Sequence, residues 1–310
     1  MVSDYNSDKN KKLVFASTVY PTKSSETNAI LLADSIRTFA GSLSKSPILY
    51  FTPEYGKQLF SAAKDRLVSL DVKVIPFKMD FETLQFPLAG DVFAAAVAES
   101  TVYSQTDLLA WLGTNTVVLR EPEAFLLQNE KNLGYRPVHH TLVGSRYDMA
   151  IDEFWTLIYS WCKVPQNRIF LMETHIDGAR IRPYFNAGML VTRPQKRLLQ
   201  TWSDIFFDSY QNLPFTRFYE KNQLYKIFIH QALLSGVILS TFETDELTEF
   251  PSTYNYPLHL YTKDVTGHRP SSIEEVVTFR HENFYHDKEW MRKMPAKQQL
   301  RQWLAERIQT

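Results

Sequence analysis

The stretch from Pro183 to Pro194 carries the strongest chemical signal in the sequence. It reads Pro-Tyr-Phe-Asn-Ala-Gly-Met-Leu-Val-Thr-Arg-Pro, so an Asn-Ala-Gly turn at residues 186–188 runs directly into an apolar segment. Glycine lets a backbone come close to a ligand, and an asparagine amide both donates and accepts hydrogen bonds. The pattern predicts a ligand-binding turn at the mouth of a strand. An ordinary glycine-containing strand start is the alternative.

The apolar residues before this turn predict the elements that must position it. Short apolar runs indicate buried strands, and apolar residues at helical spacing indicate helices. In the first part of the chain, strands are predicted at residues 13–16, 47–52, 72–77 and 107–112, and helices at residues 27–39, 55–70 and 93–103. Alternating strands and helices are typical of a parallel sheet with right-handed crossovers.

The second part of the chain continues the mixed pattern. Glu121-Pro122-Glu123 has the early proline and the acidic first turn of a helix start, and Asp152 is expected to cap a helix. The remaining predictions are a strand at 116–119, a helix at 151–162, strands within 170–191, helices at 198–210 and 224–237, a strand at 276–280 and a helix at 298–308.

Composition limits the class of protein. The 310 residues are 44% hydrophobic, enough for a sizeable core, and 34 basic residues balance 34 acidic ones, which predicts no nucleic-acid partner. No apolar run approaches the ~20 residues of a membrane span, and the polar N-terminus lacks the apolar core of a signal peptide. The single cysteine, Cys162, excludes an internal disulfide framework. We therefore expect a soluble cytoplasmic protein without a membrane span.

No internal repeat and no Gly/Ser/Pro-rich linker divides the chain. We expect residues 1–11 to form a flexible tail and residues 12–310 to form one domain.

Over residues 13–284 the chain resembles nucleotide-diphospho-sugar transferases with the GT-A fold, especially the glycogenin-like group called glycosyltransferase family 8. The Phe-Asn-Ala-Gly turn is the motif that carries this resemblance first. It implies an α/β fold with a mixed, mainly parallel central sheet and flanking helices. It also implies that Asn186, Ala187 and Gly188 lie at the sugar of a nucleotide-diphospho-sugar donor. Within the domain, it implies that residues 12–120 are the nucleotide-binding half and residues 121–310 the acceptor and sugar side.

In GT-A enzymes the first strand ends beside the nucleobase, and here that position is occupied by Thr18 and Tyr20. Ligands of open α/β sheets bind beyond the carboxyl ends of strands, so the placement is reasonable. A hydroxyl at Thr18 could contact a base edge, and Tyr20 could stack on the ring. An ordinary strand-to-loop turn is the alternative.

The sequence departs from the family's pattern at the metal site. Family members usually carry Asp-x-Asp at a strand end, where two carboxylates hold Mn²⁺ or Mg²⁺ against the diphosphate. Residues 111–122 keep the apolar frame and the following Arg and Pro, but Gly113 and Asn115 occupy the acidic positions. No metal ligand is therefore assigned. Mn²⁺ or Mg²⁺ stays open as a cofactor, although its usual carboxylate ligands are absent.

Without a metal, the charge of the diphosphate would need protein cations, which arginine supplies bidentately. The available cations are Arg120, Arg146, Arg180, Arg182 and Lys226. Arg146 and Arg182 flank the candidate site, and Arg146 is the predicted phosphate contact. A solvated surface charge is the alternative for each of them.

Two segments that contain histidine are further candidates for the site. His139-His140 is followed by Gly-Ser-Arg-Tyr at residues 144–147, and a loop of this composition could line a sugar pocket; one packed and one exposed histidine is the alternative. In the family, a segment comparable to residues 230–235 reads Asp-Gln-x-x-Leu-Asn and contributes to the transfer centre. Gln231 matches it, whereas His230 stands where Asp is usual. We therefore predict Asn186, Gln231 and His230 as catalytic residues, with a core histidine as the alternative for His230.

Tyr254-Asn255 and His281 resemble the aromatic-Asn and late-histidine segments of the family. The late histidine often joins the metal there, but its partners are missing, so we predict that His281 hydrogen-bonds a phosphate. Tyr254, Asn255, Gly113 and Asn115 complete the predicted nucleotide and sugar contacts.

The predicted function is transfer of a sugar from a nucleotide-diphospho-sugar to an unknown saccharide, lipid or protein acceptor, without a conventional Asp-x-Asp metal site. A catalytically degenerate nucleotide- or sugar-binding protein is the alternative, and the Gly113 and Asn115 replacements favour it.

Overall fold

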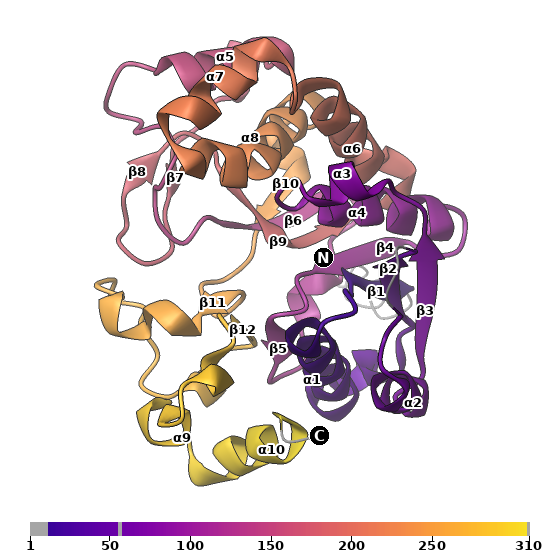
Figure 1. The fold of residues 1–310 in the computed structure, drawn as a ribbon. Coiled ribbons are helices and arrows are strands. Elements are labelled where there is room, and N and C mark those ends of the chain that lie inside the picture. Colours follow the sequence, from indigo (N-terminus) through magenta and orange to yellow (C-terminus); the bar gives the residue numbers. More distant parts are fainter. Residues whose placement is uncertain (1–11, 55–57, 309–310) are drawn as a thin grey trace.

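A mixed sheet forms the centre of the protein (Figure 1). The structure is a computed structural model that describes residues 12–54 and 58–308. The sheet has the order β10-β6-β9-β4-β1-β2-β3, and β9 runs antiparallel to both of its neighbours while the other pairs are parallel. The strands are β1 (Leu13–Thr18), β2 (Ile48–Pro53), β3 (Val72–Phe77), β4 (Leu108–Leu112), β6 (Leu133–Pro137), β9 (Phe185–Thr192) and β10 (Leu247–Glu249). The predicted mixed, mainly parallel α/β sheet is confirmed.

Successive side chains of each strand point to opposite faces of the sheet, and here the side chains on both faces are apolar. A layer of helices therefore covers each face. Leu13 and Phe15 of β1 pack under α1 (Lys23–Phe39) and α2 (Ser61–Ser69). Val14 and Ala16 pack against the other layer, which contains α4 (Ala89–Val102), α5 (Glu153–Trp161), α6 (Leu198–Ser209), α7 (Leu213–Lys221) and α8 (Gln223–Thr241). Strands buried on both faces explain why the sequence shows continuous apolar runs instead of alternation.

A second, smaller sheet joins the C-terminal part of the chain to the loop after β4. Its strands β5 (Thr116–Val118) and β12 (Thr278–Arg280) are antiparallel, with Thr116 opposite Arg280, and β11 (Tyr256–Pro257) is parallel to β12. The helices α9 (Trp290–Lys293) and α10 (Gln298–Ile308) follow, and α10 packs beside α1 (Figure 1). This docking brings residues near position 280 back to the centre of the fold.

Smaller elements complete the structure. They are α3 (Phe81–Leu84), the hairpin of β7 (Met172–Glu173) and β8 (Arg180–Ile181), and 3₁₀ turns at Gly41–Lys45, Glu123–Phe125, Gln166–Arg168, Pro194–Lys196, Thr244–Glu246, Leu258–Lys263, Ile273–Glu275 and Phe284–His286. Asp152 accepts a hydrogen bond from the Trp155 N–H at 2.9 Å, so its predicted capping role is confirmed.

Two helix predictions need correction. The helix expected to begin at Glu121-Pro122-Glu123 is only the 3₁₀ turn Glu123–Phe125, because the chain bends at Leu126, whose φ of −82° and ψ of 71° are not helical. The helix predicted over residues 55–70 begins at Ser61, and residues 55–57 lie outside the described part. The tail predicted at residues 1–11 also lies outside it. The division into halves at residue 120 stays a prediction, and the central sheet takes strands from both sides of it.

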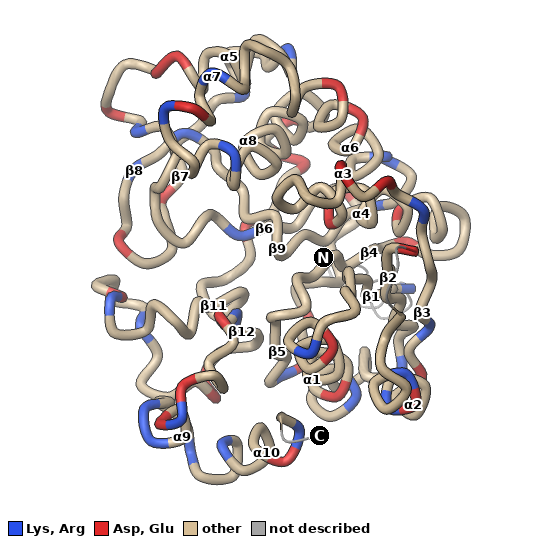
Figure 2. The backbone as a smooth tube through the Cα atoms, in the orientation of Figure 1, with Lys and Arg blue, Asp and Glu red and all other residues tan. Residues whose placement is uncertain are grey.

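Neither charge nor apolar helices divide the described part of the chain into separate regions. Basic and acidic residues are interspersed over the helices and loops of the described chain (Figure 2). One described helix, α8, is long and apolar enough to cross a membrane by length and composition, and 61% of its apolar window is buried inside the protein. Core helices of globular proteins pass the same test, so the predicted absence of a membrane span stays a prediction.

Candidate functional site

Asn186, Ala187 and Gly188 were predicted to form a turn before a strand, but this prediction is wrong, because they belong to strand β9 (Phe185–Thr192) itself, next to a register shift in its pairing with β6. The name Asn-Ala-Gly turn denotes these three residues, which lie where the carboxyl ends of β1 and β4 meet the start of β9. The Gly113 N–H, just after β4, donates to the Gly188 carbonyl at 2.9 Å. The His281 N–H donates to the Asn115 carbonyl at the same distance, so the end of β12 joins the group. Segments around residues 113, 188 and 281 therefore converge at one edge of the sheet, the edge where open α/β sheets bind ligands.

Helix α8 holds the turn in place. The Gln231 side-chain carbonyl accepts a hydrogen bond from the Ala187 N–H at 3.1 Å, and the Ser235 hydroxyl accepts one from the Phe185 N–H at the same distance. Within the turn, Asn186 Oδ1 accepts from the Gly188 N–H at 2.9 Å. The predicted pair Asn186 and Gln231 is thus brought together, and both side chains fix the backbone of the turn.

Arg280, the last residue of β12, projects its guanidinium against the turn. Arg280 Nη1 lies 3.4 Å from Asn186 Oδ1, and a Cβ built on Gly188 would come within 2.0 Å of the same nitrogen. Glycine at position 188 is therefore required by the arginine, because any larger residue would displace the guanidinium. Burial lowers the pKa of Arg280, but an arginine in a protein stays protonated.

Neutral histidines surround this cation. Burial, with the charge of Arg280 acting second, lowers the pKa of His281 to about 3 and that of His259 to about 4. The His139 pKa is lowered for the same two reasons, and its Nε2 lies 3.4 Å from Asn186 Nδ2 and 3.5 Å from Asn255 Nδ2. Since both amide nitrogens are donors, Nε2 of His139 is the acceptor, and the ring is neutral.

His230 lies deeper in the core than its predicted catalytic role suggests. Its Nδ1 hydrogen-bonds the Ile227 carbonyl at 2.9 Å, and its ring packs near Trp202. Burial lowers its pKa to about 4, so the ring is neutral at pH 7 and Nδ1 carries the proton. This environment matches the alternative of a core histidine, although the catalytic role itself stays a prediction.

Thr18 and Tyr20 reach the same edge from β1. The Tyr20 hydroxyl donates to Asp91 Oδ2 at 2.8 Å, at the start of α4. Burial raises the pKa of both groups, and the charge of Arg280 acts on Asp91. Asp91 and Arg280 belong to the site by position, but the sequence analysis did not assign them. The only sequence signal for Arg280 was its place directly before His281.

Several polar atoms at this edge are buried without a hydrogen-bond partner. Among the described residues they include Asn255 Oδ1 and His281 Nε2. Thr18 Oγ1 also lacks a partner of hydrogen-bond geometry, although it lies close enough to Asp91 to act against the rise in the pKa of that carboxyl. Buried polar atoms in folded proteins are normally paired, and unpaired ones ask for an explanation such as a ligand. All three belong to residues predicted as donor contacts.

The loop in the position of Asp-x-Asp is built differently from a metal site. Asn115 Nδ2 donates to the His281 carbonyl at 2.8 Å, so its amide cross-links the loop to the end of β12. Gly113 has no ligand atom. Within residues 12–54 and 58–308, no cluster of three or more His, Cys, Asp or Glu side chains is arranged to hold a metal ion.

Two predicted contact residues are engaged elsewhere. Arg146 is exposed in the loop after β6 and forms a bidentate ion pair with Asp148, at 2.9 and 3.1 Å. Tyr254 is buried in a stack with Phe250 beside Phe125, and its hydroxyl accepts from the Ala124 N–H at 3.1 Å. The structure does not bring either side chain into contact with the Asn-Ala-Gly turn.

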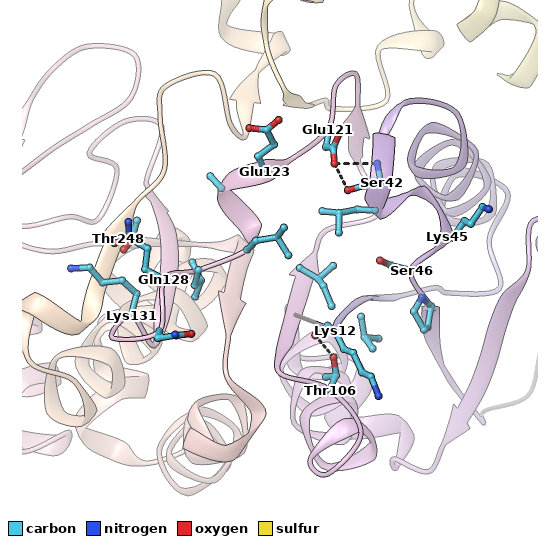
Figure 3. A pocket seen from close by; sticks show the side chains of 18 of the residues that line it. Lys12, Ser42, Lys45, Ser46, Thr106, Glu121, Glu123, Gln128, Lys131 and Thr248 are labelled. Carbon is cyan, nitrogen blue, oxygen red and sulfur yellow. Dashed lines mark hydrogen bonds between the residues drawn. The ribbon is translucent and has the colours of Figure 1, made fainter. Parts of the chain in front are cut away.

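A wide groove of about 1690 Å³ lies at the other edge of the sheet (Figure 3). It is lined where the parallel strands begin, by residues such as Lys12 before β1, Pro47 before β2 and Thr106 before β4. The backbone N–H and the hydroxyl of Ser42 both donate to the Glu121 carboxylate, and this contact forms part of the groove's wall. This edge is opposite the ligand-binding edge of open α/β sheets, so the groove is separate from the candidate site.

Comparison with solved structures identifies the fold. The chain is similar to the galactosyltransferase LgtC, solved in complex with donor and acceptor sugar analogs, at 14% identity and a TM-score of 0.53, with 96% of this chain and 95% of that chain covered. The bifunctional glycosyltransferase WbbM (11% identity, TM-score 0.48, 97% and 52% covered) and GlyE of Streptococcus pneumoniae TIGR4 (11%, 0.47, 97% and 61%) also align.

Sequence comparison identifies the family. No curated protein sequence matches the chain. Residues 17–239 match the family described as the Rhodobacterales glycosyltransferase domain, which spans more than two thirds of the 310 residues. The chain therefore belongs to the Rhodobacterales glycosyltransferase domain family, and its fold is similar to that of the galactosyltransferase LgtC.

Proposed function

We propose that this protein binds a nucleotide-diphospho-sugar at the carboxyl edge of its sheet and transfers the sugar to an acceptor hydroxyl without a conventional metal site. The observation that carries the proposal is the set of unpaired buried polar atoms on Thr18, Asn255 and His281, gathered around the Asn-Ala-Gly turn in a glycosyltransferase domain. A bound donor would give these atoms the partners they lack.

In the transfer, the bond between the sugar C1 and the diphosphate oxygen breaks, and a bond to the acceptor oxygen forms as the acceptor hydroxyl loses its proton. The protein's main task is to stabilise the negative charge that develops on the leaving diphosphate. In this proposal Asn186 and Gln231 position the sugar, and Thr18 and Tyr20 position the base. Asn115 ties the loop in the position of Asp-x-Asp to the end of β12 instead of binding a metal.

The test is a panel of uridine, guanosine, thymidine and cytidine diphosphate sugars, each with EDTA or with Mn²⁺, measured by thermal shift and calorimetry. A ligand of the folded state raises the melting temperature by mass action. We expect at least one donor to bind equally well with and without Mn²⁺. A panel in which no donor binds under either condition would overturn the proposal.

A degenerate, non-catalytic binding protein is the second candidate, and the Gly113 and Asn115 positions favour it. Incubation with the donor that binds separates the two, because a transferase releases nucleoside diphosphate by transfer to sugar acceptors or to water. Tight binding without any release of nucleoside diphosphate would support the binding protein.

A further inference from the structure

The guanidinium of Arg280 makes few hydrogen bonds within the protein. A guanidinium has five N–H donors, yet among the described residues the side chain of Arg280 makes one hydrogen bond, 3.4 Å long, to Asn186 and one 4.0 Å ion pair with Glu282. The Asp91 carboxylate attracts it without a hydrogen bond. The Glu282 side chain is 59% exposed, so water weakens that ion pair. Most of the donor capacity of Arg280 is therefore available to a ligand.

The other cations considered near the site are differently placed. Arg146 is held by both carboxylate oxygens of Asp148. Arg182 donates to the Ser145 hydroxyl and to the carbonyls of Arg146 and Met149, which fixes the loop before α5. Arg280 differs from both because its guanidinium faces the Asn-Ala-Gly turn and, among the described residues, no carboxylate hydrogen-bonds to it; the carboxylates of Glu282 and Asp91 act on it only through their charge.

His281 adds a second donor next to it. The Asn283 N–H donates to His281 Nδ1 at 3.2 Å, so Nδ1 is the acceptor and the proton of the neutral ring sits on Nε2. That Nε2 is fully buried and has no partner among the described residues. The carbonyl of the same residue accepts from Asn115, so the segment is anchored to the loop that replaces Asp-x-Asp.

We propose that Arg280, assisted by the Nε2–H of His281, binds the diphosphate of the donor and supplies the positive charge that a metal ion supplies in Asp-x-Asp enzymes. The inference rests on the proposed function. Arginine suits this role because its planar fork donates to two phosphate oxygens at once and its charge does not depend on pH. Replacement of both motif carboxylates by Gly113 and Asn115 fits it, since carboxylates would repel a diphosphate that no metal bridges.

The experiment compares the wild-type protein with Arg280→Gln, which removes the charge, and Arg280→Lys, which keeps it without the fork. The ligands are inorganic pyrophosphate, the nucleotide-sugar that binds best in the panel above, and the matching nucleoside without phosphates. Arg292→Gln on α9, whose side chain is 78% exposed, is the matched control. Melting temperatures establish that each variant is folded.

We expect Arg280→Gln to weaken nucleotide-sugar and pyrophosphate binding at least tenfold and to leave nucleoside binding unchanged. Arg280→Lys should recover part of the loss, and Arg292→Gln should behave as wild type. Glu282→Gln should strengthen binding slightly, because it removes the competing carboxylate.

The outcomes separate the two proposals. If the wild type binds a nucleotide-sugar and Arg280→Gln binds it equally well, the assignment of Arg280 is overturned while the proposed function stands. If pyrophosphate binds through Arg280 but no nucleotide-sugar binds, the anion site stands and the proposed function falls. If neither ligand binds the folded wild type, both proposals fall.

Discussion

The Asn115 side chain joins two segments that are 166 residues apart in the sequence. An aspartate in its place could not donate to the His281 carbonyl and would put a carboxylate oxygen against a carbonyl oxygen. The amide that appears in the sequence as a lost metal ligand is thus a structural cross-link. This role explains why asparagine is compatible with the position when no metal is bound.

This view predicts how the site responds to metal. Donor binding by the wild type should not change on addition of EDTA, whereas a protein that depends on Mn²⁺ would lose tenfold or more, ~1.4 kcal/mol per factor of ten. Gly113→Asp combined with Asn115→Asp should create Mn²⁺-dependent binding, because a Cβ at residue 113 meets only the tip of the Asn115 side chain closely, at 2.8 Å. Calorimetry of both proteins with and without Mn²⁺ checks the prediction, and a tenfold loss of wild-type affinity in EDTA would contradict it.

A second prediction concerns Gly188. In Gly188→Ala the new methyl group would lie 2.0 Å from Arg280 Nη1, so the guanidinium must move although its charge is retained. We expect tenfold weaker donor binding and a melting temperature within a few degrees of wild type, since the displaced group is the end of a flexible side chain. Gly267→Ala, whose new methyl group would meet no atom within 4 Å, is the control. Unchanged donor affinity in Gly188→Ala would show that the position of Arg280 is immaterial.

At the scale of elements, α8 supports the site because it packs tightly against α5. A Cβ at Gly236 of α8 would lie 2.6 Å from Cys162 Sγ and 3.2 Å from Ile158 Cγ2. Gly236 therefore allows the close approach that lets Gln231 and Ser235 reach the Asn-Ala-Gly turn.

Gly236→Ala should destabilise the protein by roughly 1–2 kcal/mol. Overpacking costs about 1–3 kcal/mol, and the better helix propensity of alanine offsets up to ~1 kcal/mol. Cys162→Ala removes the sulfur atom, so the double variant should recover part of the loss. Urea unfolding of the four proteins in this cycle measures the coupling; additive single effects would show that the two positions do not meet.

The sequence predicted most elements because their signals are local. β3 and α10 have the predicted bounds, and β1, α1 and α8 differ from them only at their ends. The helix α7 (Leu213–Lys221) was missed because its apolar residues are aromatic and its first turn contains Pro214, which resembles a loop. The helix expected at Glu121 failed for the opposite reason. Its start signals are local, but Phe125 packs against Phe250 and Tyr254, and the chain bends directly after it at Leu126.

The site was predicted less completely, since it depends on pairings that no local pattern reveals. The Asn-Ala-Gly turn, Gln231, Asn255 and His281 lie together, and sequence motifs identified them. Arg280 was overlooked because its value depends on its guanidinium facing Gly188, which only the antiparallel pairing of β5 and β12 determines. Arg146 was predicted as the phosphate contact instead, because its ion pair with Asp148, two residues away, is not evident from the sequence.

On the scale of the whole molecule, buried neutral histidines make stability depend on pH. Burial is the main cause that lowers the pKa of His175 to about 3, of His230 to about 4 and of His281 to about 3. In the unfolded chain these groups have pKa values near 6.5, so between about pH 6.5 and pH 4 the unfolded state binds more protons. The stability that these histidines contribute is therefore fully present above pH 6.5 and falls as the pH decreases. Burial raises the pKa of Glu99 to about 7, so this one carboxyl acts in the opposite direction and offsets part of the decrease.

Each such histidine costs up to about 1.4 kcal/mol of unfolding free energy per pH unit in that range. Urea unfolding at pH 7.5, 6.0 and 5.0 should show a steady decrease. His175→Phe keeps a ring of similar size without a titrating group, so its stability should decrease less steeply than that of wild type. An unfolding free energy that is constant from pH 7.5 to pH 5.0 would contradict the prediction.

The pairing of β5 with β12 also sets the order in which the protein becomes competent during synthesis. A ribosome makes the chain from its N-terminus, and the family domain, residues 17–239, is complete before Asn255, Arg280 and His281 exist. A nascent chain can already form most strands of the main sheet while the cation of the candidate site is still missing. Pairing across more than 150 residues is also slow to form. The side chains proposed to hold a charged donor thus reach their places as one of the last events of folding.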